Sequence, residues 1–145
     1  MTPILEQIRA ELKANADEKT RQSSKRFFKE QIVLYGVKTA TVGKISKKYW
    51  LQIKLLGKKE IFGLCEELFQ SDFMEEAGIV GDWLPKYIDH LEASDIFTFK
   101  RWIERYINNW AKCDVFCNHT IGDLIQKFPE IVGEVKSWAH SSNRW

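Results

Sequence analysis

The sequence has 145 residues, a length that fits one domain and can bury a sizeable core. Hydrophobic residues make up 44% of it and charged residues 29%, a composition that is typical of globular proteins and excludes a disordered chain. The formal net charge of +2 is too small to indicate a nucleic-acid binder by itself, so the placement of the cations has to decide that question.

The N-terminus and the cysteines indicate the compartment. Residues 1–6 lack a basic segment followed by an apolar one, and no uninterrupted apolar run approaches membrane-spanning length. The three cysteines include no CxxC pair, which fits a reducing compartment better than a disulfide framework. We therefore expect a cytoplasmic protein with no membrane partner.

The first part of the chain predicts helices with recognisable start signals. A proline near the start and apolar residues at helical spacing predict a first helix that ends near Asn15. Asp17 can cap a second helix, which we expect to continue through the following cations and phenylalanines and to break at Gly36, where glycine allows a positive φ or a close backbone approach. A third helix then opens at Thr39 or Thr41.

The middle of the chain predicts further helices, separated by glycine, proline and capping residues. Gly57 stops the third helix, and residues 59–70 carry the apolar spacing of the next one. Asp72 begins another helix, which contains Pro85 and should be kinked or ended early there. Ser94 is the expected cap of the helix that follows.

The stretch from Asn108 to His119 is the most informative part of the sequence. We expect it to open a helix that continues to Lys127, so that Trp110 and Asp114, four residues apart, share one face. An aromatic ring beside a carboxylate favours the binding of a cationic ligand. The same pair is also common as core filler beside a solvated or capping carboxylate.

The helix count and spacing predict the fold class. Pro129 starts a last helix, and no convincing alternating strand pattern occurs. Helix pairs recur roughly every 35 to 40 residues, a period typical of HEAT-like units. We expect an all-α HEAT-like helical repeat array forming one domain over residues 1–145, with a plain helical bundle as the alternative. Residues 141–145 suggest a helix link and the start of another helix, so we expect the N-terminal portion of a longer protein.

Several segments, taken in order, resemble a known family. They are Lys25-Arg26-Phe27-Phe28-Lys29-Glu30 followed by Tyr35-Gly36-Val37-Lys38, the Trp110-x-x-x-Asp114 helix with Cys117-Asn118-His119, and the Ser-Ser-Asn-x-Trp ending. From the second helix to the C-terminus, the chain resembles the HEAT-like repeat DNA alkylation repair family, the AlkD-like alkylpurine DNA glycosylases.

The resemblance implies an activity and its residues. It implies that a monomer excises positively charged alkylpurines, such as 3-methyladenine and 7-methylguanine, from duplex DNA without a metal or other cofactor. By position, Asp114 matches the family's catalytic carboxylate and Trp110 its aromatic partner. Phe27 stands where some members carry a tyrosine and is the expected lesion-packing residue. The family's arginine that contacts the DNA backbone beside the carboxylate would lie beyond Trp145, so one expectation is that these 145 residues alone are inactive.

Cations recur at helical spacing and could track DNA phosphates, although lysines on solvated helix faces are ordinary. Arg101 and Arg105 are four residues apart and near the Trp110 helix, but they could equally pair with Asp95 or Glu104. The predicted DNA-binding residues are Lys25, Arg26, Lys29, Lys38, Lys44, Lys47, Lys48, Arg101 and Arg105.

Two other interpretations were weighed. Cys113, Cys117 and His119 suggest a zinc site, but no second cluster supplies the remaining ligands of a tetrahedral site, so we expect buried free thiols and no metal. The alternative to a glycosylase is a non-catalytic helical repeat that serves as a DNA- or protein-binding platform. Dependence of activity on an alkylated base separates the two.

Overall fold

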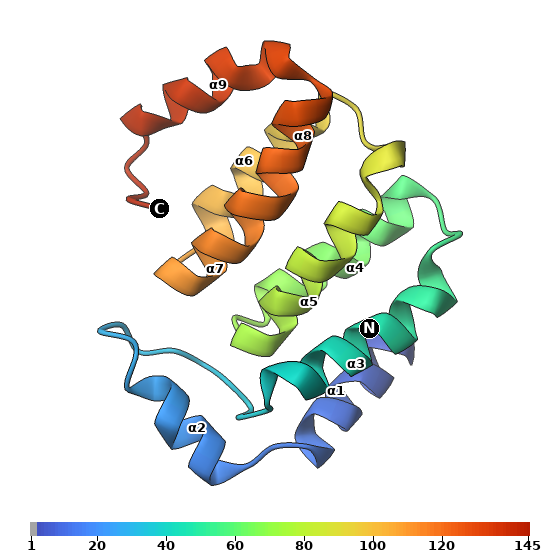
Figure 1. Ribbon diagram of the computed structural model, residues 1–145, viewed down its shortest axis with the longest axis vertical. Coiled ribbons are helices and arrows are strands. Elements are labelled where there is room, and N and C mark those ends of the chain that lie inside the picture. Colours follow the sequence, from blue (N-terminus) through green and yellow to red (C-terminus); the bar gives the residue numbers. More distant parts are fainter. Residues whose placement is uncertain (1–2) are drawn as a thin grey trace. The chain divides into compact units, whose positions relative to one another are not determined.

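The computed structural model describes residues 3–145, which form an all-α helical repeat fold (Figure 1). Within these residues the only strand-like pairing is an isolated bridge between Val33 and Phe73. No helix in the described part of the chain has the length and apolar character needed to cross a membrane. The main helices are α1 (Pro3–Ala14), α2 (Glu18–Lys25), α3 (Thr39–Ile53), α4 (Lys58–Gln70), α5 (Met74–Lys86), α6 (Asp95–Tyr106), α7 (Trp110–Val115), α8 (Gly122–Lys127) and α9 (Val132–Ser137).

The chain divides into two compact units, Met1–Trp83 and Leu84–Trp145. In the first unit α1 lies beside α3 (Figure 1), and α1 buries Leu5, Ile8 and Leu12 completely. These residues recur every three or four positions, so one stripe of α1 faces the core. The predicted end of this first helix near Asn15 is confirmed.

The second helix is shorter than predicted. Asp17 caps α2 as expected, since its carboxylate accepts a hydrogen bond from the backbone N–H of Thr20 at 2.9 Å. However, α2 ends at Lys25, and the chain continues without regular structure up to α3. The predicted continuation through Lys29 was wrong, because the backbone N–H groups of residues 26–28 form turn hydrogen bonds with the carbonyls three residues back, such as Phe28 to Lys25 at 3.2 Å, in place of α-helical ones. Gly36 does adopt the positive φ that was expected, at +90°.

Two predicted boundaries in the middle of the chain need correction. The third helix begins at Thr39 but ends at Ile53, and Gly57 is the N-cap of α4 with an ordinary φ of −70°. Asp72 has a left-handed φ of +65°, and the next helix begins only at Met74. Pro85 lies in the last turn of α5, which ends one residue later, so the predicted early end is confirmed.

In the second unit α6 lies beside one continuous helical stretch formed by α7, a π-helical turn η2 (Phe116–Ile121) and α8 (Figure 1). Phe116 packs edge-on against Phe99 of α6, with ring centroids 5.6 Å apart. The predicted helix to Lys127 is therefore confirmed, with a π-turn in its middle. Ser94 makes no side-chain cap bond, contrary to expectation.

The end of the second unit departs from a regular helix. The predicted helix after Pro129 consists of the 3-10 turn η3 (Pro129–Ile131), α9 and the 3-10 turn η4 (Trp138–His140). Residues 141–145 are not helical. Instead, the Asn143 amide donates to the carbonyl of Ile103 at 2.9 Å and ties this segment to α6.

Candidate functional site

The helix that carries Trp110 and Asp114 begins at a well-formed cap. Asn109 is extended, with φ −156° and ψ 167°, and its side-chain oxygen accepts the backbone N–H of Lys112 at 3.0 Å. This bond satisfies one of the amide groups that every helix leaves open in its first turn. The cap fixes Trp110 as the first residue of α7.

Trp110 and Asp114 lie one turn apart on the same helix, as the sequence predicted. The indole is 44% exposed, and the Asp114 carboxylate is exposed as well. Within the described residues Asp114 forms no hydrogen bond and no ion pair. A negative charge and an aromatic face are thus both accessible to a ligand on one side of α7.

The opposite side of this helix is anchored in the core of the second unit. Phe116 is 1% exposed and contacts both Phe99 and Trp102. Lys112 is also buried, and its ammonium donates to the side-chain oxygen of Asn108 at 3.1 Å. Because one side of the helix is held by packing, the exposed side presents Trp110 and Asp114 in a fixed arrangement.

Two cysteines, Cys113 and Cys117, lie near Asp114 in the same helical stretch. Their sulfur atoms lie 3.9 Å apart, and both residues are half-buried, which corrects the expectation of fully buried thiols. Burial, followed by the nearby Cys113 and the charge of Asp114, raises the pKa of Cys117 to about 12. In the described part of the chain, no group of three or more His, Cys, Asp or Glu side chains is placed to hold a metal ion.

A cavity in the second unit does not include this exposed pair. It has a volume of about 350 Å³ and is lined by residues that include Ile103, Cys117 and Trp138. Trp110 and Asp114 are not among its lining residues. The candidate site is therefore an open helix face, a shape that suits a polymer better than an enclosed small molecule.

The second unit contains two of the predicted DNA-binding cations, and both lie on α6. Arg101 and Arg105 are exposed and one turn apart, so they share a face of this helix. Arg105 forms no ion pair within the described residues, so the alternative pairing with Asp95 or Glu104 does not occur for it. Its guanidinium is available for a phosphate.

The predicted cations of the first unit lie in three places. Lys25 ends α2, while Arg26 and Lys29 are exposed in the irregular segment that follows it. Phe27, between them, is 72% exposed. The remaining members are Lys38 at the N-cap of α3 and Lys44, Lys47 and Lys48 on α3 itself, all exposed.

Lys48 differs from its neighbours because it already has a partner. Its ammonium forms an ion pair with the carboxylate of Glu11 on α1, which also accepts a hydrogen bond from the Tyr49 hydroxyl at 2.7 Å. These hydrogen bonds, first from Lys48 and then from Tyr49, lower the pKa of Glu11 below its ordinary value. Of the three lysines on α3, Lys48 therefore has the least charge to offer a phosphate.

The sequence analysis missed a pair of buried carboxylates in the first turn of α5. Glu75 is 7% exposed and Glu76 is completely buried. Both contact the segment before α3, and Glu76 also forms a 3.0 Å ion pair with Arg9. The sequence did contain a signal for the position of these two carboxylates: acidic residues stabilise the first turn of a helix, and here two of them precede an otherwise apolar helix. Their burial depends on a distant segment that no local pattern reveals.

Comparison with known proteins adds one finding. A family model described as DNA alkylation repair enzyme matches residues 8–145, nearly the whole chain. A search of curated proteins found no match.

Proposed function

Because this chain belongs to the DNA alkylation repair enzyme family, we propose that it is a DNA glycosylase that hydrolyses the N-glycosidic bond of cationic alkylated purines in duplex DNA. Membership of the family supports a role in DNA repair, with DNA as the partner. The proposal adds the reaction, the lesions, which include 3-methyladenine and 7-methylguanine, and action as a cytoplasmic monomer without a cofactor.

One observation carries this proposal: the exposed Asp114 carboxylate, unpaired within the described residues, lies one turn from the half-exposed indole of Trp110. Since no group in the described part of its own fold neutralises Asp114, its full charge can act on a bound ligand. The indole face beside it favours contact with a cation.

The chemistry fits these two groups. Alkylation at a ring nitrogen makes the purine a cation and a good leaving group, so cleavage needs little acid catalysis. As the bond to the base breaks, positive charge develops on the deoxyribose. Asp114 stabilises that charge and orients the attacking water, while Trp110 packs against the lesion nucleotide. Bound DNA displaces water from the carboxylate, and the lower local dielectric strengthens its attraction to the sugar cation.

The basic residues supply DNA affinity in this proposal. The cations on α3, on α6 and after α2 contact phosphates, which requires only charge and reach. Phe27, exposed at 72%, packs against the lesion region of the duplex. Lys48 contributes less than the others because Glu11 already neutralises its ammonium.

The experiment that tests this function measures free 7-methylguanine released from methylated duplex DNA. Unmethylated duplex is the control. We expect release only from methylated DNA. A folded protein that binds methylated and plain duplex equally and releases no base would instead be a binding platform.

A further inference from the structure

A buried carboxylate holds the last part of the segment between α2 and α3. Residues 26–38 form no helix, yet their last part is fixed against the start of α5. The Glu75 carboxylate accepts three consecutive backbone N–H groups: those of Tyr35 at 3.0 Å, Gly36 at 2.9 Å and Val37 at 3.1 Å. One side chain thus replaces the hydrogen bonds that a helix or sheet would otherwise provide for this backbone.

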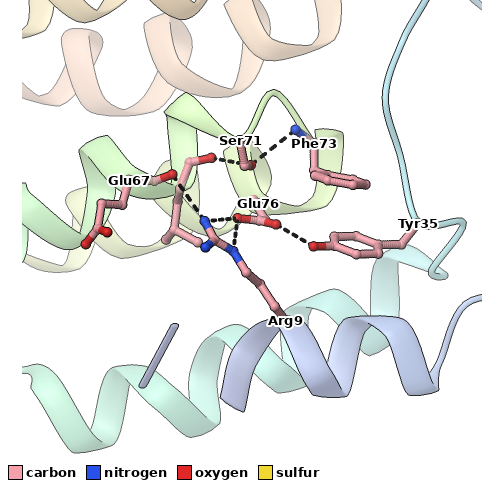
Figure 2. Close-up of polar contacts among 7 residues, drawn as sticks. Arg9, Tyr35, Glu67, Ser71, Phe73 and Glu76 are labelled. Carbon is pink, nitrogen blue, oxygen red and sulfur yellow. Dashed lines mark hydrogen bonds and ion pairs between the residues drawn. The ribbon is translucent and has the colours of Figure 1, made fainter. Parts of the chain in front are cut away.

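Contacts around Glu75 strengthen the attachment. The carbonyl of Val33 accepts the backbone N–H of Met74 at 2.8 Å, and the ring of Tyr35 stacks on that of Phe73 with centroids 4.0 Å apart. Figure 2 shows the Tyr35 hydroxyl pointing at Glu76, to which it donates at 2.6 Å. The segment is therefore attached from Val33 onward, both through its backbone and through Tyr35.

The roles of the two neighbouring carboxylates are distinct. Glu76 holds the Tyr35 side chain and Arg9, and these contacts join α5 to α1 (Figure 2). Glu75 instead holds only the backbone of the segment, according to its hydrogen bonds. Charge-assisted bonds to backbone N–H groups are stronger than neutral ones, and each donor left without its partner in a buried place is costly. Loss of Glu75 should therefore loosen the backbone of residues 35–37, while the contacts of Val33 and of the Tyr35 side chain remain.

The attached residues, from Val33 onward, restrict the conformations of the exposed residues 26–32 that precede them. Residues 26–32 connect the end of α2 to the attachment at Val33 and include the exposed Arg26, Phe27 and Lys29. A short irregular connection fixed at both ends has far fewer conformations than one fixed at a single end. Restricting the backbone that carries these cations before a ligand arrives lowers the entropy lost on binding.

We propose that Glu75 is a positioning residue for DNA binding: by fixing the backbone of residues 35–37, it preorganises Arg26 and Lys29 to contact phosphates. This inference rests on the proposed function, since it takes duplex DNA as the ligand of these cations. Glu75 is buried and does not itself touch the DNA. Its effect is transmitted through the backbone of the segment.

The first variants to compare are Glu75→Gln and Tyr35→Phe. Glutamine has no charge and directs amide hydrogens at backbone donors, so Glu75→Gln should weaken duplex affinity about tenfold and speed amide hydrogen exchange at residues 35–37. Tyr35→Phe removes the bond to Glu76 but leaves all three Glu75 bonds in place. It should reduce thermal stability without changing affinity. If Glu75→Gln fails to fold, Glu75→Asp, which keeps the charge but shortens the side chain, replaces it.

The decisive measurement is a double-mutant cycle with Arg26→Ala/Lys29→Ala, a variant whose segment has lost both cations. If Glu75 acts through these cations, Glu75→Gln should cause no further loss of affinity in that background. An equal tenfold loss in both backgrounds would overturn the proposal, because Glu75 would then support the fold in general. Unchanged affinity of Glu75→Gln despite faster exchange would overturn it too. A wild-type chain that binds no duplex would instead refute the proposed function.

Discussion

Carboxylates in this chain occur in two opposite environments. Asp114 is exposed and forms no hydrogen bond or ion pair within the described residues, whereas Glu75 is buried under three backbone donors. The first arrangement leaves a charge for a ligand, and the second uses a charge to hold the chain. The shared helix face of Trp110 and Asp114 could be predicted from their spacing, whereas the burial of Glu75 depends on a contact between α5 and residues 35–37 that no local pattern reveals.

At the residue scale, Gly36 should tolerate no side chain. Its φ is +90°, and an added Cβ would lie 2.6 Å from the Cβ of Arg21 and 2.7 Å from the carbonyl oxygen of Asp17. Gly36→Ala should therefore lower the free energy of unfolding by at least about 1–2 kcal/mol, measured by urea denaturation. Gly43→Ala is the matched control, because nothing lies within 4 Å of a Cβ there. A stable Gly36→Ala protein would contradict the observed backbone conformation.

Glu11 should make stability depend on acid pH. Its pKa is lowered from 4.5 in the folded protein, mainly by the hydrogen bond from Lys48. A lowered folded-state pKa means that the stabilisation is present above the unfolded value and is lost as pH falls through the folded value. The difference in melting temperature between wild type and Glu11→Gln should therefore shrink between about pH 6 and about pH 3. A constant difference would show that the ion pair with Lys48 contributes little.

At the element scale, local patterns predicted helices better than their ends. The apolar spacing of α1 and α4 predicted both helices closely, because each buries one stripe against its own unit. The end of α2 at Lys25 was not predicted, since the charged and apolar residues continue past it in sequence, whereas the backbone of residues 26–28 forms turn hydrogen bonds. The π-helical turn η2 could not be predicted from the sequence either, because nothing in its composition distinguishes it from an α-helical turn.

The helix α7 depends on its Asn109 cap, which leads to a second prediction at this scale. Asn109→Ala removes the acceptor for the Lys112 N–H, which should cost about 1 kcal/mol of stability and loosen the turn that carries Trp110. Thermal unfolding measures the first effect, and base excision should fall with it. Asn118→Ala, an exposed amide later in the same helical stretch, is the control. Equal stability of the two variants would rule out a capping role.

At the scale of the whole molecule, charge placement matters more than the net charge of +2. Exposed cations lie on α3 and after α2 in one unit and on α6 in the other, while the candidate carboxylate lies on α7. In the proposed function the cations hold the phosphates and Asp114 acts on the sugar. Binding and catalysis therefore belong to different residues and can be separated by mutation.

The measurement that separates binding from catalysis compares three proteins: wild type, Asp114→Asn and Glu130→Gln. For each protein it determines the duplex affinity and the single-turnover rate of 7-methylguanine release. Asparagine has nearly the same shape as aspartate and, within the described residues, breaks no contact, so fold and affinity should be retained. Glu130→Gln neutralises another exposed carboxylate of the same unit and should change neither the duplex affinity nor the excision rate. We expect Asp114→Asn to slow excision about 10²–10³-fold with unchanged affinity. Excision at the wild-type rate by Asp114→Asn would contradict the proposed role of this carboxylate.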